Sequence, residues 1–325
     1  MCLVGKEDKL PKIVNCLILI PFPSISLRLS IVSSLESFLP FPDDFTRGVL
    51  PIPCHSHNDY WRDIPLFDAI AVGCTSNSRT SNGTELYIGH DSGVLTADRT
   101  LRAMYLDPLM YILDQINSDN PQKATPGGIL ESDCNATFVV LLDFKNKSPE
   151  TDIWKLVQAP LQPLREKNYL TYWNSTLNTR IMRPLTIVTT GDAPFDISTN
   201  LNSTSNINQD IFYDAPLDKL EATSTTYTTA NLYCASVSLA DAVGKAQFGI
   251  SSSQLKMIDK QINTARDLDL VSRYWDTAPW PLNIRNGIWS DLLESNVGIM
   301  NLDQLWAASA RHWTLCWGLG WGICA

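Results

Sequence analysis

The segment FVVLLDFK, residues 138–145, is the part of the sequence that best indicates the fold. A continuous apolar run, without alternating polar residues, is typical of a strand buried on both faces in a parallel sheet. The segment ends with Asp143 and Lys145, which lie two residues apart and therefore share one face of a strand. Such a strand needs similar neighbours on both sides, and the sequence contains them.

Further segments repeat this pattern of a short apolar run that ends on a polar or acidic residue. They are residues 49–59, 185–192, 210–216, 232–238, 268–276 and 297–303. Segments of helical character lie between them, at residues 63–72, 149–168, 253–267 and 284–296. Alternating strands and helices predict an α/β fold with a parallel sheet. With the first segment this makes seven strands, and an eighth would close a TIM-type (β/α)8 barrel.

The eighth strand is expected second in the chain, between residue 72 and His90. The segment GCTSNSRTSNG, residues 73–83, contains no apolar run, and only ELYIGH, residues 85–90, resembles a short strand. We therefore predict a barrel whose second strand is truncated. A gap at this place would expose two sheet edges and reduce the stability of the chain.

Composition and charge exclude some functions. The chain of 325 residues is 44% hydrophobic, which is sufficient for a large core, and its net charge of −9 disfavours nucleic acid as a partner. We predict an N-terminal segment at residues 1–48, a barrel at 49–306 and a C-terminal tail at 307–325. Nothing in the sequence indicates a protein partner.

The N-terminus leaves the localisation open. An uncharged run at residues 13–27 follows three lysines, in the layout of a secretory signal, but it is shorter than the about 20 residues that span a bilayer. No transmembrane span is predicted. N-x-S/T sequons at five positions give weak support to the secretory pathway; they are Asn82, Asn135, Asn146, Asn174 and Asn202.

Eight cysteines are present, and none belongs to a C-x-x-C pair, so no structural zinc site is expected. A disulfide between Cys54 and Cys74 is one alternative. The other is that these residues are buried as small hydrophobic thiols.

Three of the four histidines lie within 36 residues, and each has an Asp or Asn nearby: His55, His57 and His90. One alternative is that they only form local hydrogen bonds at strand ends. A zinc hydrolase site is the second, but the later strand ends carry no further histidine to bind the metal. The third is a pair of histidines that cleaves a phosphodiester beside a hard, oxygen-ligated cation.

The phosphodiester alternative accounts for most of the polar residues. One imidazole would take a proton from the attacking hydroxyl or water, and the other would protonate the leaving oxygen. Asp143 supplies a carboxylate for Mg²⁺, and Lys145 offers a positive charge to the phosphoryl oxygens. The sequence therefore favours a site that combines these two residues with His55 and His90.

Several segments, in this order along the chain, resemble the fungal altered-inheritance-of-mitochondria protein 6 family. They are HSHNDYWRDIPLFDAIAVGC (55–74), ELYIGHDSGVLTADRTL (85–101), VVLLDFK (139–145), IFYDAPL (211–217), YCASVSLADAVG (233–244), RYWDTAPWP (273–281) and VGIMNLDQL (297–305). This family belongs to the phospholipase-C-like phosphodiesterases, with glycerophosphodiester phosphodiesterases and sphingomyelinase D as relatives. The resemblance implies a TIM-type barrel that acts on a small phosphodiester or a lipid head group.

The resemblance also implies roles for single residues. His55 and His90 match the two catalytic histidines, and Asp143 matches a carboxylate that binds Mg²⁺. The residues implied in binding substrate or phosphate are Asn58, Lys145 and Trp275. His57 and Asp91 would orient their neighbours.

One departure from the family pattern affects the metal site. The family places a Glu-x-Asp pair at the end of the second strand, whereas Glu85 is the only acid between Asp68 and Asp91 here. A magnesium ion held by two fewer carboxylates loses most of its charge compensation. We therefore expect either a phosphoric diester hydrolase or, as the alternative, an impaired member that binds a phosphate ester without turnover.

Overall fold

The computed structural model describes residues 46–81, 86–89, 95–118, 125–144, 150–193, 195 and 209–313. For residues 77–81 and 150–155 only the backbone is described. The described residues belong to one compact unit that begins at Thr46. The predicted segment 1–48 lies almost entirely outside them, and the predicted domain boundaries stay predictions.

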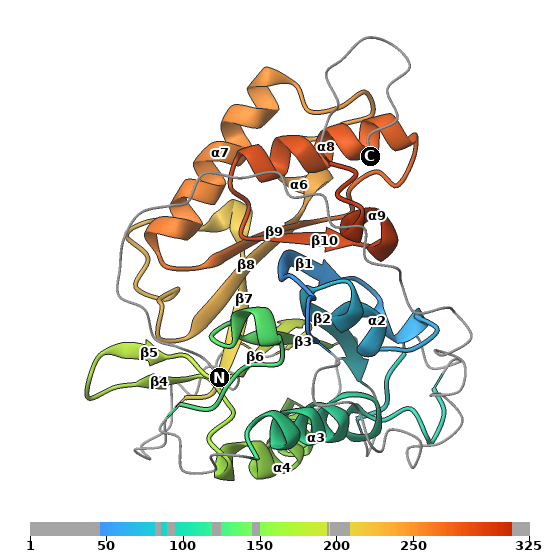
Figure 1. The fold of residues 1–325 in the computed structure, drawn as a ribbon. Coiled ribbons are helices and arrows are strands. Elements are labelled where there is room, and N and C mark those ends of the chain that lie inside the picture. The colour runs from blue at the N-terminus through green and yellow to red at the C-terminus, as the bar shows by residue number, and fades with distance from the viewer. Residues whose placement is uncertain are drawn as a thin grey trace. The chain divides into compact units, whose positions relative to one another are not determined.

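Eight parallel strands form a closed barrel, with helices around its outside (Figure 1). The order around the barrel is β1, β10, β9, β8, β7, β6, β3, β2. The strands are β1 (Ile52–Ser56), β2 (Cys74–Ser81), β3 (Phe138–Phe144), β6 (Leu185–Gly191), β7 (Ile211–Pro216), β8 (Leu232–Ser238), β9 (Val271–Trp275) and β10 (Ile299–Leu302). The TIM-type fold is confirmed, and each predicted apolar run contains one of these strands.

The helices that cover the barrel follow the predicted alternation. They are α2 (Phe67–Ala71), α3 (Asp107–Ile116), α4 (Glu150–Glu166), α6 (Leu239–Val243), α7 (Ser252–Asp267), α8 (Leu282–Glu294) and α9 (Leu305–Ser309). Short helical turns precede or interrupt them: η2 (Asp59–Trp61), η4 (Arg102–Leu106), η5 (Glu131–Asp133) and η6 (Leu217–Lys219). Within the described part of the chain, no helix is long and apolar enough to cross a membrane.

The second strand is complete, which corrects the prediction that it is truncated. β2 pairs in parallel with β1 on one side, and six consecutive residues from Ser76 to Ser81 pair with β3 on the other. Its residues need no apolar run because their backbone N–H and C=O groups bond to two neighbouring strands. The barrel therefore closes without the exposed edges that a gap would have left.

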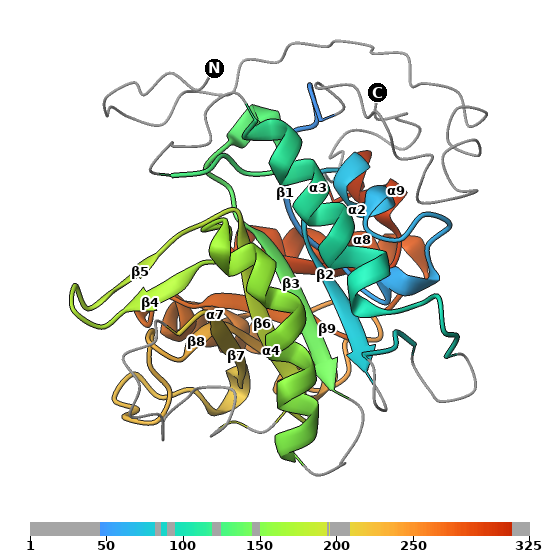
Figure 2. The ribbon, with the colours of Figure 1, turned by 90° about the horizontal axis from the view of Figure 1, so that it is seen from below.

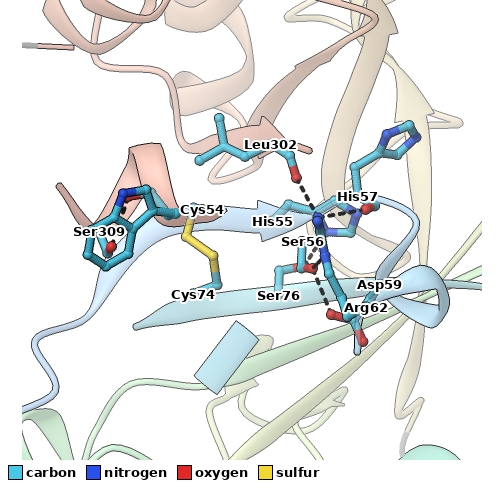
Figure 3. Close-up of a disulfide and its surroundings, with 11 residues drawn as sticks. Cys54, His55, Ser56, His57, Asp59, Arg62, Cys74, Ser76, Leu302 and Ser309 are labelled. Carbon is cyan, nitrogen blue, oxygen red and sulfur yellow. Dashed lines mark hydrogen bonds between the residues drawn. A yellow bond between two sulfur atoms is a disulfide. The ribbon is translucent and has the colours of Figure 1, made fainter. Parts of the chain in front are cut away.

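A disulfide links β1 to β2, the two strands between which the barrel closes. Cys54 of β1 and Cys74 of β2 form a bond across a sequence separation of 20 residues (Figure 3). Both side chains are fully buried in the cluster that packs the barrel against its helices. Cys134 is disulfide-bonded as well, whereas Cys234 is a free, buried thiol. Of the two alternatives for Cys54 and Cys74, the disulfide is correct.

The barrel interior changes from apolar to polar along the strands. An apolar cluster taken from adjacent strands, without helix residues, fills it near the amino ends; it contains Val139, Leu141, Val188, Phe212, Tyr233 and Cys234. Two residues further along, on the same face, six of the eight strands carry a polar residue after an apolar one. The pairs are Leu141/Asp143, Val188/Thr190, Phe212/Asp214, Cys234/Ser236, Val271/Arg273 and Ile299/Asn301. The carboxyl end of the barrel is therefore lined by polar side chains.

A β-hairpin closes the amino end of the barrel. It consists of β4 (Tyr172–Asn174) and β5 (Thr179–Ile181), and it projects beside α4 in Figure 2. Arg180 of the hairpin is buried against the rings of Phe212 and Tyr233, and it donates to the carbonyl of Leu232 at 2.8 Å. The sequence did not predict this hairpin, because its strands are short and partly exposed.

The disulfide should contribute measurably to stability. We expect the double substitution Cys54→Ala/Cys74→Ala to lower the free energy of unfolding by about 3 kcal/mol, because the unfolded chain loses a constraint on a loop of this length. Urea denaturation of the two proteins under non-reducing conditions measures the difference. Equal unfolding free energies would show that the strand ladder alone fixes β2.

Candidate functional site

His55 lies near the carboxyl end of β1, with 1% of its surface exposed. A hydrogen bond of 2.7 Å joins its Nδ1 to the hydroxyl of Ser76 on β2 (Figure 3). The two residues are also partners in the strand register. This contact fixes the orientation of the imidazole, because a hydrogen bond at one ring nitrogen sets the role of the other.

A buried carboxylate organises the loop that follows β1. The Ser56 hydroxyl donates to Asp59 at 2.6 Å, and the backbone N–H of Leu66 donates to it at 2.7 Å. The Tyr105 hydroxyl adds a third hydrogen bond of 2.8 Å. Asp59 is fully buried, and these donors satisfy its charge. The loop therefore holds one conformation beside His55.

His57 faces the neighbouring strand end. Its Nδ1 lies 2.9 Å from the carboxylate of Asp303, which follows β10. Burial opposes the ionisation of Asp303, but the hydrogen bond and charge of His57 and the charge of Arg62 outweigh it and lower the pKa of this carboxyl. Asn58 has a left-handed backbone conformation, and its amide nitrogen is 3.4 Å from Nδ1 of His57. His57 therefore contacts both Asn58 and Asp303, and its predicted supporting role stays a prediction.

Arg62 ties the ends of β1 and β10 together. Its guanidinium donates to the carbonyls of His57 at 3.1 Å and Leu302 at 3.2 Å (Figure 3), and to that of Asp303 at 2.5 Å. It also donates to the hydroxyl of Ser56 at 3.2 Å. The Leu302 carbonyl also accepts from the backbone N–H of His57 at 3.0 Å, so Arg62 adds to the hydrogen bonds where the parallel ladder ends.

A buried ion pair lies across the barrel interior from β1. Arg273 of β9 donates to Ser236 at 2.9 Å and to Asn301 at 2.8 Å, and it pairs with Asp214 at 3.5 Å. Asp214 also accepts from Ser236 at 2.7 Å and from Thr190 at 3.0 Å. Burial raises the pKa of the Asp214 carboxyl, while Arg273 and the hydroxyl donors act in the opposite direction.

This network connects to the histidine. Asn301 of β10 is the register partner of His55, so the polar interior continues from β6 through β10 to β1 and Ser76. The members of this network are bonded to one another, so the polar interior beside the His55 strand is fixed in one arrangement.

Asp143 lies near the carboxyl end of β3, and its register partner on β6 is Thr190. Gly191 directly follows Thr190 and has a φ of +69°. A Cβ atom on this glycine would lie only 2.2 Å from the Asp143 carboxylate. Only glycine leaves room for this carboxylate and adopts this backbone conformation without strain. Asp143 therefore lies at the carboxyl end of the barrel, and its role as a metal ligand stays a prediction.

The described donors do not form a magnesium site by themselves. Among the residues that the structure describes, no group of three or more His, Cys, Asp or Glu side chains could hold a metal ion. Asp143 is a single carboxylate, and β2 contains no acid. Mg²⁺ needs near-octahedral oxygen ligation and strong charge compensation, so this donor set does not fit the ion that the resemblance implies.

The remaining predicted residues divide into two groups. Trp275 ends β9 with its side chain partly exposed at the barrel rim. His90, Asp91 and Lys145 lie outside the described residues, and their roles stay predictions.

Sequence reasoning missed most of the polar interior. The sequence did not single out Ser76, Asp214, Arg273 or Asn301. The signal was available in the two-residue spacing: in six strands, the residue two positions after the last inward apolar residue is polar.

The effects of replacing Arg273 and Asp214 on the free energy of unfolding should be coupled. We expect Arg273→Met to lower the free energy of unfolding by about 3–5 kcal/mol, because it leaves the Asp214 carboxylate without its cation. Combining it with Asp214→Asn should cost less than the sum of the single changes. Urea denaturation measures the cycle, with the exposed Arg266→Met as a control that changes stability by less than about 0.5 kcal/mol. Additive single changes would contradict the coupling.

The missing metal ligands can be added without changing the strand length. Residues 78 and 80 follow Ser76 at the spacing that brings strand residues to one face, and Thr80 is in register with Asp143. We expect Ser78→Glu/Thr80→Asp to bind Mg²⁺ in the millimolar range and the unaltered chain to bind none, as measured by isothermal titration calorimetry. The uncharged control Ser78→Gln/Thr80→Asn should also bind none. Equal binding by the unaltered chain would mean that other oxygen ligands complete the site.

Comparisons with known proteins agree with this architecture. The family model of the AIM6-like phosphodiesterase domain matches residues 43–214, more than half of the chain. An altered inheritance of mitochondria protein 6 homolog from Arthroderma benhamiae is 35% identical over 283 residues, which cover 82% of this chain and 86% of that protein. The altered inheritance of mitochondria protein 6 of Kluyveromyces lactis is 31% identical over 315 residues, with 83% and 74% covered.

A third relative, the altered inheritance of mitochondria protein 6 of Eremothecium gossypii, is 30% identical over 268 residues, which cover 78% of this chain and 68% of that protein. No solved structure matches the chain significantly. Since the family model and these relatives span most of the barrel, the chain belongs to the fungal AIM6-like phosphodiesterase family.

Proposed function

We propose that this protein is a phosphoric diester hydrolase-type enzyme whose substrate is a small phosphodiester or a lipid head group. The observation that carries the proposal is the oriented, buried His55 at the carboxyl end of a barrel in a phosphodiesterase family. In TIM-type barrels this end holds the active site. The acid-rich composition agrees with a small or lipid-linked substrate rather than nucleic acid.

The proposed chemistry uses two histidines as acid and base. One takes a proton from the attacking hydroxyl or water as its oxygen bonds to phosphorus, and the other gives a proton to the oxygen that leaves. His55 is one of the pair, and His90 is proposed as the other. The Ser76 hydroxyl keeps the His55 ring in one orientation throughout the exchange.

Residues at the mouth of the barrel would bind the phosphate. Asn58 sits beside His57 on the loop after β1, and Trp275 stands at the end of β9. We assign Lys145 to the phosphoryl oxygens because it follows Asp143 by two residues. No step is assigned to Mg²⁺, since the described carboxylates do not form its site.

The second candidate is a protein that binds a phosphate ester without turnover. The absence of any acid from β2 favours it, because the family's metal pair belongs there. The barrel closes despite this loss, so a folded binding pocket and an inactive centre are compatible.

Hydrolysis of bis-p-nitrophenyl phosphate separates the two candidates. If the protein is an enzyme, His55→Ala and His90→Ala should each reduce the rate at least about a hundredfold, the usual loss of a general acid or base. His312→Ala is the matched control, because His312 is exposed beyond the last helix of the described chain, and it should leave the rate unchanged. The release of p-nitrophenolate measures each rate.

The controls for this test include a chelator. Activity that survives both histidine substitutions would rule out the two-histidine mechanism. No turnover, together with binding of glycerophosphocholine that EDTA does not weaken, would support the non-catalytic candidate. Turnover that EDTA abolishes and Mg²⁺ restores would contradict that candidate and show that other ligands hold the ion.

A further inference from the structure

Large apolar side chains stand exposed at the carboxyl end of the barrel. Phe248 is 93% exposed, Trp280 is 71% exposed and Trp61 is 70% exposed. Leu282 and Trp275, which lie close to Trp280 in the sequence, are also exposed, but to a smaller extent. Single exposed apolar residues are ordinary, but several large ones at one end of a molecule indicate an interaction surface.

These residues occupy one sector of the barrel rim. Trp61 lies in η2 after β1, and Trp275, Trp280 and Leu282 lie in or beside the connection from β9 to α8. Phe248 lies between α6, which directly follows β8, and α7. Since β1, β10, β9 and β8 are consecutive around the barrel, their carboxyl-end connections are neighbours. We call these five residues, four aromatic ones and Leu282, the aromatic rim.

The connections that carry the aromatic rim are held in place. The Trp61 ring meets the ring of buried Tyr60 edge-on at 5.7 Å, and Arg99 donates to the Tyr60 carbonyl. Trp280 stands between Pro279 and Pro281, which restrict its backbone. These two indoles are therefore presented by restrained backbone, and little conformational entropy is lost when they meet a partner.

The segment before Phe248 is anchored as well. The side chain of Gln254, in the first turn of α7, donates to the carbonyls of Val243, Gly244 and Lys245 at 3.1 to 3.3 Å. Ser251 and Gln254 form a capping box that fixes the start of this helix. Phe248 therefore projects from a short stretch that is held at both ends.

Charge and side-chain type identify the partner. Indole rings prefer the boundary between water and lipid, because they combine a large apolar surface with one polar N–H. The charges in these connections are mainly acidic: besides the buried Asp59 they carry Asp63, Asp241, Asp276 and Asp303 against Lys245, with Arg62 engaged by the strand ends. Together with the net charge of −9, this disfavours an anionic lipid surface and leaves a zwitterionic one.

We propose that the aromatic rim docks the barrel mouth onto the surface of a zwitterionic phospholipid bilayer. The side chains enter the head-group region, and the carboxyl end with His55 and Asp143 then faces the lipid head groups. The inference gives the proposed function a substrate class, the phosphodiester of a bilayer lipid, and for that purpose it rests on the proposed function. Docking itself needs no turnover and can be measured separately.

Vesicle binding tests the proposal with the full chain. Phosphatidylcholine vesicles should sediment with the protein, and the double substitution Phe248→Ser/Trp280→Ser should weaken this binding at least about tenfold, because two large apolar side chains no longer enter the lipid. Leu177→Ser is the matched control, since Leu177 is 65% exposed on the β4–β5 hairpin at the opposite, amino end. It should bind like the unaltered chain.

Each outcome decides a separate claim. No sedimentation with phosphatidylcholine, or equal binding by the rim variant, would overturn the docking proposal. Binding only to vesicles of phosphatidylserine would overturn it too. Self-association in analytical ultracentrifugation that the rim variant abolishes, without vesicle binding, would assign the surface to a second copy of the chain and reject the lipid.

Hydrolysis of the soluble bis-p-nitrophenyl phosphate keeps the two proposals distinguishable. The rim variant should retain this rate while it loses hydrolysis of the same vesicles' phosphatidylcholine. If neither substrate is hydrolysed but the vesicles bind in a rim-dependent way, the docking inference stands and the hydrolase proposal fails. If the soluble substrate is hydrolysed without any vesicle binding, the reverse holds.

Discussion

The backbone hydrogen bonds of β2 to β1 and β3 are the constraint on which the rest of the structure depends. β2 is built from Cys, Ser, Thr, Asn and Arg, and its own side chains offer little hydrophobic free energy. Its backbone nevertheless bonds to two strands whose apolar outer faces are already buried. The buried Cys54–Cys74 bond ties the start of this strand covalently to β1. Because the register is fixed, Ser76 reaches His55, and the closed barrel positions every other strand end.

The interior shows how one strand period can build both a core and a site. Each inward apolar residue contributes to the packed layer near the amino ends, and the polar residue two positions later lies at the carboxyl end. A guanidinium in such a place is tolerable only if its charge and donors are satisfied, and Arg273 meets this requirement with Asp214, Ser236 and Asn301. The polar layer is thus rigid because its members satisfy one another.

The sequence predicted the strands that fold by their own hydrophobicity and missed what depends on neighbours. FVVLLDFK and the other apolar runs were recognisable because a strand buried on both faces must be apolar. β2 was not, since its stability comes from pairing and a covalent link, which no local pattern records. Asp214 and Arg273 were visible as residues, but their partnership joins β7 to β9 and requires the register of the closed barrel. The contact of His57 with Asp303 could not be read from the sequence, because the two residues lie 246 positions apart.

The polar composition of β2 has different consequences for folding, for histidine chemistry and for metal binding. For folding it is sufficient, because parallel pairing satisfies the backbone whatever the side chains are. For histidine chemistry it is favourable, because Ser76 supplies the hydroxyl that orients His55. For a metal it is unfavourable, because no residue from Cys74 to Ser81 carries a carboxylate. A protein of this kind can keep its barrel, its oriented imidazole and its polar interior while it loses the charge that would hold a cation. Fold and catalytic competence are therefore set by different properties of a single strand: the first by its backbone, the second by its side chains.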